Sequence, residues 1–169
     1  MQSDVVDDIL NQWSEERPEL NAAPLGVVIR VMSLYRSFLR EATRALEPLG
    51  LELWEYDVLS ALRRQGQPFA LPATALARET DLSSGAMTNR IDRLEERGLV
   101  SRHPDEEDRR SVIVSLTRQG RKVIDEAIQH RLDAASESLR DLENEELQQL
   151  AKLLRIVVLS AERDCTKYE

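Results

Sequence analysis

The chain has 169 residues and a formal net charge of −8, which excludes a basic coat over the whole surface. Charged residues make up 32% of the chain and aromatic residues only 4%, a balance that favours a helical protein over a β-sandwich. The length allows one substantial core or two small lobes that share a helix. DNA binding stays open, because a local basic face is enough to meet phosphate.

Several function classes find no support in the sequence. We expect no enzyme, because there is no phosphate-binding glycine loop and no nucleophile elbow. The single cysteine, Cys165, permits no disulfide framework, and His103 and His130 lack metal-ligand spacing, so we expect neither metal nor cofactor. No run approaches the ~18 apolar residues of a membrane span. We therefore expect a soluble, cytoplasmic protein without a membrane partner.

Helical patterns dominate both ends of the chain. A first helix is expected from about residue 4 to 16, and a longer one from 24 to 46. The apolar residues of the longer helix follow a 4-3-4-3-4 spacing, which suits packing against helices of two subunits. At the other end, we expect a helix capped by Thr117 that runs to about 141, followed by a last amphipathic helix.

The middle of the chain predicts a helix-turn-helix. A helix over 52–65 precedes a short helix over 73–79, and the tight turn 80–83 leads into a helix over 84–97. Two short helices joined by such a turn, with polar residues exposed on the second, are typical of this DNA-binding motif.

A wing is expected directly after the motif. The β-prone runs 99–103 and 111–116 flank a charged turn and predict a two-stranded hairpin. The expected fold is therefore mainly α with a small β-hairpin wing. Its winged helix-turn-helix lobe spans 51–117, between helical segments at 1–50 and 118–169.

The helix over 84–97 has two different faces. Met87, Ile91 and Leu94 fall at i, i+4 and i+7 and form a stripe toward the core. Small and hydrogen-bonding residues on the outer side suit close approach to base edges in a major groove. We expect base contacts from Ser84, Thr88, Asn89 and Arg93.

The charged turn offers a second DNA contact. Narrow A·T-rich minor grooves concentrate negative potential, so Arg109 or Arg110 at a hairpin tip is expected to enter one. Asp108 would orient the guanidinium through a charge-assisted bond.

Several of these segments resemble the MarR family of bacterial transcription regulators. The resemblance implies a homodimer in which the dimerisation helices of 1–50 and 118–169 interlock. Each subunit would place its recognition helix in the major groove of a palindromic operator and its wing in the flanking minor groove. It is carried by segments 76–77, 84–95, 98–100, 108–110 and 114–120.

The expected helix before Pro18 is similar to the added N-terminal helix of the urate-responsive and PecS-like branch. That resemblance implies a ligand-response set of Trp13, Asp57, Arg90 and Arg102. Such a set suits a small anionic aromatic effector, because an indole stacks on a flat ring and a guanidinium pairs with an anionic oxygen. We expect a repressor that such a ligand, for example urate, releases from DNA.

Three alternatives remain open. The same fold can sense a phenolic acid, a carboxylic acid or an oxidant. A helical dimer can instead act through protein partners, with a winged lobe that does not bind DNA. Finally, Asp57 can form a static ion pair with Arg90 or Arg102 rather than a switch.

Overall fold

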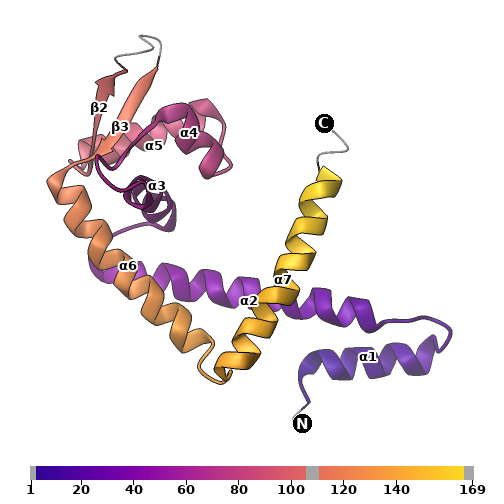
Figure 1. Ribbon diagram of the computed structural model, residues 1–169. Coiled ribbons are helices and arrows are strands. Elements are labelled where there is room, and N and C mark those ends of the chain that lie inside the picture. Colours follow the sequence, from indigo (N-terminus) through magenta and orange to yellow (C-terminus); the bar gives the residue numbers. More distant parts are fainter. Residues whose placement is uncertain (1–2, 106–110, 166–169) are drawn as a thin grey trace.

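Helices account for most of residues 3–105 and 111–165, the part of the chain that this computed structural model describes (Figure 1). Three short strands form one small sheet beside them. The elements in chain order are α1 (Val5–Glu16), α2 (Ala23–Leu46), the 3-10 helix η1 (Glu47–Leu49), α3 (Leu53–Arg64), β1 (Ala70–Pro72), α4 (Ala73–Glu79), α5 (Ser84–Glu96), β2 (Val100–Pro104), β3 (Val112–Leu116), α6 (Arg118–Ser138) and α7 (Asn144–Cys165). The expected mainly α fold with a winged lobe is confirmed.

The predicted hairpin is confirmed as the antiparallel pair of β2 and β3, and a third strand that was not predicted, β1, joins the sheet. The antiparallel order is β1-β3-β2, with Leu71 opposite Val114 and Arg102 opposite the same residue from the other side. The strand β1 was not predicted from the sequence because it has only three residues and ends in Pro72. A proline fits there because β1 is an edge strand, where one missing N–H donor is tolerated.

A single apolar core joins the winged lobe to the first half of α6. It is enclosed by α3, α4, α5 and the sheet, and it receives Ile124 and Ala127 from α6. Burial of this apolar surface is the main stabilising term for the lobe. The other buried members are Leu46, Leu51, Val58, Leu59, Ala61, Leu62, Leu76, Ala77, Met87, Ile91, Leu94, Leu99, Val100 and Val114.

The junction between β3 and α6 is unusually tight. Thr117 caps α6, because its hydroxyl accepts the N–H of Gly120 at 2.9 Å and donates to the carbonyl of Gly98 at 2.7 Å. A Cβ on Gly120 would lie 1.9 Å from the carbonyl oxygen of Leu99. A glycine is therefore needed here by close backbone approach. The helix ends at Ser138, earlier than the expected end near 141.

The predicted N-terminal helix is present and is held against α2. Asp4 caps α1, and the Arg30 guanidinium binds both Asp4 at 2.8 Å and Asp7 at 2.6 Å. The hydrogen bond from Arg30 lowers the pKa of Asp4. Leu10 packs so closely on Gly26 that a Cβ there would lie 2.7 Å from its methyl group.

The long helices expose many apolar side chains. After the turn at their shared end, α6 and α7 diverge as an open V, and α7 stands apart from the winged lobe (Figure 1). Over the described part of the chain, no helix is both long and apolar enough to cross a membrane. The exposed apolar residues of α2 and α7 include Val27, Val28, Val31, Met32, Leu34, Tyr35, Leu39, Leu153, Leu154, Ile156, Val157, Val158 and Leu159.

Candidate DNA interface and effector site

The helix-turn-helix is built by local hydrogen bonds and one apolar anchor. The Thr80 hydroxyl donates to the carbonyl of Leu76 at 2.8 Å, and the N–H of Leu82 donates to Ala77 at 2.9 Å. These bonds close α4, while the side chain of Leu82 packs against the core. Ser83 then caps α5 by accepting the N–H of Ala86. The turn therefore fixes where the recognition helix starts.

The four side chains predicted to contact bases are all exposed on α5. Ser84, Thr88, Asn89 and Arg93 face solvent, whereas Met87, Ile91 and Leu94 are buried. The Thr88 hydroxyl donates to the Ser84 carbonyl at 2.9 Å, which leaves its methyl group and oxygen lone pairs available. Contact of these four residues with DNA stays a prediction.

The predicted minor-groove contact cannot be placed. Asp108, Arg109 and Arg110 lie outside the described residues, which stop at Asp105 and resume at Ser111. The strands on either side of this gap have the register of a wing, because Pro104 pairs with Val112.

Arg102 binds the recognition helix. Its guanidinium lies 2.5 Å from Asp92 and 3.7 Å from Glu95 and donates to the carbonyl of Thr88 at 3.3 Å. A static Asp57–Arg102 pair, one of the alternatives considered, is therefore absent from this conformation. Arg102 instead ties β2 to α5.

Arg90 and Arg93 share an aromatic ring that is not among the predicted site residues. Their guanidinium carbons lie 5.3 Å and 5.0 Å from the centre of the Trp54 ring, within cation–π range. Glu52 accepts the indole N–H of Trp54 at 2.8 Å and a guanidinium hydrogen of Arg93 at 3.3 Å. The sequence offered a signal for Trp54, because it lies three residues before Asp57 and therefore on the same face of the same helix.

Asp57 faces three arginines from three helices. Partial burial raises the pKa of Asp57, and the positive charges of Arg131, Arg90 and Arg64 oppose that rise. Arg64 is already bound to Glu79 at 3.0 Å. The ion pairs of the described residues include neither Arg90 nor Arg131, so neither guanidinium has a carboxylate within ion-pair distance.

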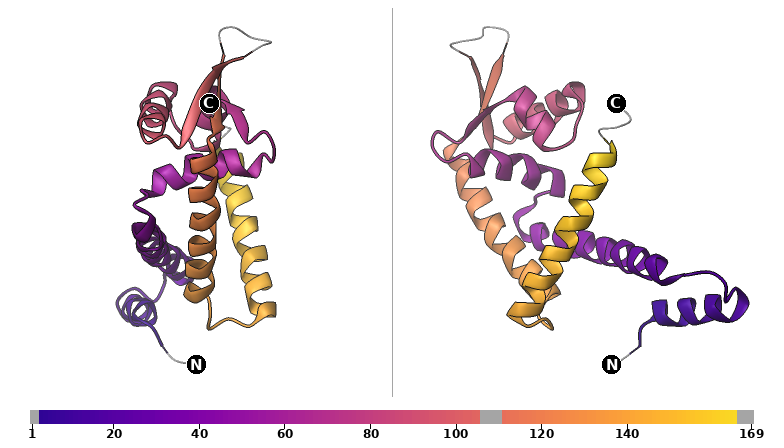
Figure 2. Two further views of the ribbon diagram at one scale, coloured as in Figure 1. Left: turned by 90° about the vertical axis from the view of Figure 1, so that its left-hand side faces the viewer. Right: turned by 45° about the vertical axis from the view of Figure 1, so that its right-hand side comes forward.

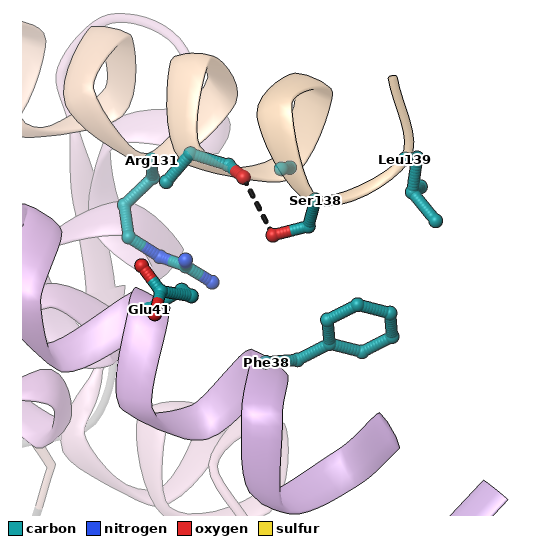
Figure 3. Close-up of a pocket in the computed structure, with 7 residues that line it drawn as sticks. Phe38, Glu41, Arg131, Ser138 and Leu139 are labelled. Carbon is teal, nitrogen blue, oxygen red and sulfur yellow. Dashed lines mark hydrogen bonds between the residues drawn. The ribbon is translucent and has the colours of Figure 1, made fainter. Parts of the chain in front are cut away.

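Arg131 connects this region to a hollow between α2 and α6 (Figure 3). Its guanidinium carbon lies 5.5 Å from the centre of the Tyr56 ring, and its buried Nε has no hydrogen-bond partner in the described structure. The hollow measures about 220 Å³ and is mostly apolar, with Phe38 and Glu41 on the α2 side. The sequence offered a signal for Arg131, because this cation falls on the apolar stripe of α6, seven residues after Ile124.

Within one chain, the four predicted ligand-response residues do not meet. Asp57 and Arg90 influence each other electrostatically, but Arg102 binds α5 and Trp13 lies on α1. All views place α1 at the end of the molecule opposite the winged lobe (Figure 2). Trp13 is 44% exposed and contributes no surface to the Asp57 region of its own chain.

Comparisons with known proteins agree with this geometry. The model of the MarR family matches residues 49–111. The HTH-type transcriptional regulator PecS of Dickeya dadantii is 32% identical over 149 residues, which cover 88% of this chain and 90% of PecS. The multiple antibiotic resistance protein MarR of Salmonella typhimurium is 27% identical over 80% of this chain and 91% of its own.

Solved structures share the architecture. AbsC from Streptomyces coelicolor, a MarR family transcriptional regulator, superposes with a TM-score of 0.76, over 85% of this chain and 97% of AbsC. At 24% sequence identity, this likeness shows the fold alone. A mutant MarR from E. coli complexed with operator DNA gives a TM-score of 0.69 at 26% identity, over 92% of this chain and 99% of its own.

Proposed function

Because this chain belongs to the MarR family of DNA-binding transcriptional regulators, we propose that it is a homodimeric repressor of a palindromic operator, released by a small anionic aromatic ligand such as urate. The observation that carries the DNA-binding part is the winged lobe with an exposed polar face on α5. In this proposal, 51–117 binds DNA, and 1–50 and 118–169 form the dimer.

The exposed apolar faces of α2 and α7 support the dimer. The many large apolar side chains exposed along these two long helices are more than a monomer exposes without a partner. A two-fold dimer would bury these faces and place two recognition helices about one turn of DNA apart, roughly 34 Å. That spacing explains why a palindrome is proposed.

The charges around Asp57 support an anionic effector. Arg90 and Arg131 take part in none of the ion pairs of the described residues, although both interact electrostatically with Asp57, and each lies against an aromatic ring. An anion bound between them would pair with both positive charges, while the rings offer apolar surface to a flat ligand. Since Arg90 belongs to α5, ligand binding would act directly on the DNA-reading helix. Trp13 would contribute only from the partner subunit.

DNA binding is tested by selecting duplexes from a random pool with the wild-type protein. We expect a palindromic consensus and saturable binding by one dimer, with sedimentation equilibrium reporting the mass of two chains. Recovery of no consensus at moderate salt would reject the DNA-binding proposal and leave the alternative of a dimer that acts through protein partners.

The effector is tested by adding urate to the complex with the selected duplex. We expect weaker DNA binding and a raised melting temperature of the free protein, because a ligand that binds the folded state stabilises it. Arg90→Gln should abolish both effects, whereas Arg44→Gln, at an exposed arginine of α2, should preserve them. If a phenolic or aliphatic carboxylic acid releases the DNA and urate does not, the ligand assignment is wrong although the fold and the DNA function stand.

A further inference from the structure

The start of α3 holds one of the proposed DNA-reading arginines in place. The Trp54 ring lies under the guanidinium of Arg93, and the carboxylate of Glu52 accepts a hydrogen bond from each of them. Arg93 thus meets a flat aromatic face and an anionic edge, although its side chain stays 61% exposed. Neither Glu52 nor Trp54 belongs to the predicted set of DNA contacts.

The base of this arrangement is anchored in the core. The backbone N–H of Glu52 donates to the Glu55 carboxylate at 2.9 Å, and the side chain of Glu55 is only 2% exposed. Arg97 binds Glu55 at 2.5 Å and the Gly50 carbonyl at 3.0 Å, which joins the end of α5 to the start of α3. Glu52 therefore projects from a fixed backbone position next to α5.

A fixed guanidinium matters for base reading. Two parallel hydrogen bonds to a guanine edge require the plane of the guanidinium to be aligned with the base. A free arginine loses rotamer entropy when it adopts that pose, whereas an arginine already held between a ring and a carboxylate loses less. The Glu52 carboxylate also repels DNA phosphates and so disfavours contacts in which Arg93 binds only the backbone.

We propose that Glu52 and Trp54 are positioning residues that hold Arg93 for sequence-specific contact and weaken its non-specific contact with phosphate. This inference rests on the DNA-binding part of the proposed function, and it is tested without an effector because Trp54 also contacts Arg90. An exposed ion pair contributes little to stability, so the effect should appear in DNA discrimination rather than in the free energy of unfolding.

The test compares Glu52→Gln with wild type on the selected duplex and on a scrambled duplex. We expect tighter binding of the scrambled duplex and a ratio of the two dissociation constants that falls by about two- to fivefold, the range expected for an exposed ion pair. Repeating the selection with the variant should relax base preference at one position in each half-site. The unfolding curve should stay unchanged.

Glu96→Gln is the matched control, because it removes an equal charge from an exposed position of α5. If Glu52→Gln changes both affinities to the same degree as Glu96→Gln, with base preference intact, the charge acts only by general repulsion and the inference is overturned. A consensus selected by wild type together with an unchanged ratio in Glu52→Gln would reject the inference while the proposed function stands.

Two variants of Trp54 separate the ring from its hydrogen bond. Trp54→Phe keeps an aromatic face but cannot donate to Glu52, and it should retain part of the discrimination. Trp54→Leu removes the face as well and should lower the ratio at least as far as Glu52→Gln, with circular dichroism used to verify that the variant is folded. Full discrimination in a folded Trp54→Leu protein would contradict the role of the ring.

Discussion

Gly120 offers a sharp test of the packing between the winged lobe and α6. In Gly120→Ala, the new Cβ would meet the Leu99 backbone at 1.9 Å from oxygen and 2.8 Å from carbon. Ordinary contact begins near 3.4 Å, so α6 and the backbone of Leu99, just before β2, must separate by about 1.5 Å. No flexible side chain can absorb this movement, since the atoms that clash are backbone.

The cost can be worked out from the neighbouring contacts. Overpacking of a tight site costs about 1–3 kcal/mol, and a weakened Thr117 cap bond adds about 0.5–1.5 kcal/mol. The better helix propensity of alanine returns about 0.5–1 kcal/mol. We expect the free energy of unfolding to fall by about 2–3 kcal/mol, or the melting temperature to fall by roughly 5–10 °C for a chain of this size.

Urea denaturation followed by circular dichroism, at one fixed protein concentration, measures this change. Gly85→Ala is the control, because a Cβ at this helical position meets nothing within 4 Å, and a small gain of up to about 1 kcal/mol is expected. If Gly120→Ala is as stable as wild type, or gains stability as Gly85→Ala does, the close approach to Leu99 does not constrain the fold.

Three further substitutions test separate contacts. In Arg30→Gln, α1 should be digested faster by protease at neutral pH than in the wild type. Since Arg30 lowers the pKa of Asp4, α1 of the wild type should detach from α2 only as the pH falls through that lowered pKa. Equal digestion rates of the variant and the wild type at neutral pH would contradict this docking. Glu55→Gln should lower the free energy of unfolding by about 1–3 kcal/mol in urea, because a buried carboxylate loses its charge-assisted bond from Arg97; an unchanged midpoint would refute this. Asp57→Asn should raise the melting temperature at neutral pH, because burial raises the pKa of Asp57 and ionisation of this carboxyl group therefore destabilises the fold. The gain in melting temperature should shrink in acid, where Asp57 is protonated. A gain that does not depend on pH would contradict burial of the ionised carboxylate as its cause.

Periodicity and capping were sufficient to predict the helices from the sequence. The stripe of Met87, Ile91 and Leu94 is buried as expected, and Ser83 and Thr117 cap the helices that follow them. These patterns are local, because a helix repeats every 3.6 residues and its first turn needs side-chain acceptors. The strand β1 was not predicted, because its apolar and polar residues do not alternate and because it pairs only with a strand far along the chain.

The side-chain partners of the candidate site were less predictable. Arg90 was expected in the ligand-response set by resemblance, but its ring partner, Trp54, comes from another helix whose packing the sequence does not encode locally. Arg102 matched a ligand-response pattern by spacing, whereas in the folded lobe Asp92 is the carboxylate nearest to it. Which of several carboxylates an arginine meets depends on tertiary packing, which spacing along the chain does not determine.

The order of the sheet has a mechanical consequence for regulation. Chain order runs from β1 through α4 and α5 to β2 and β3, and β1 and β2 flank β3, so both ends of the helix-turn-helix are fastened to the same strand. Arg102 adds a further tie between β2 and α5. The recognition helix and the wing would therefore move together as one rigid body. In the proposed dimer, a ligand that binds Arg90 on α5 would therefore move the whole winged lobe, and it would lower operator affinity by changing the distance between the two recognition helices so that it no longer matches the helical repeat of DNA.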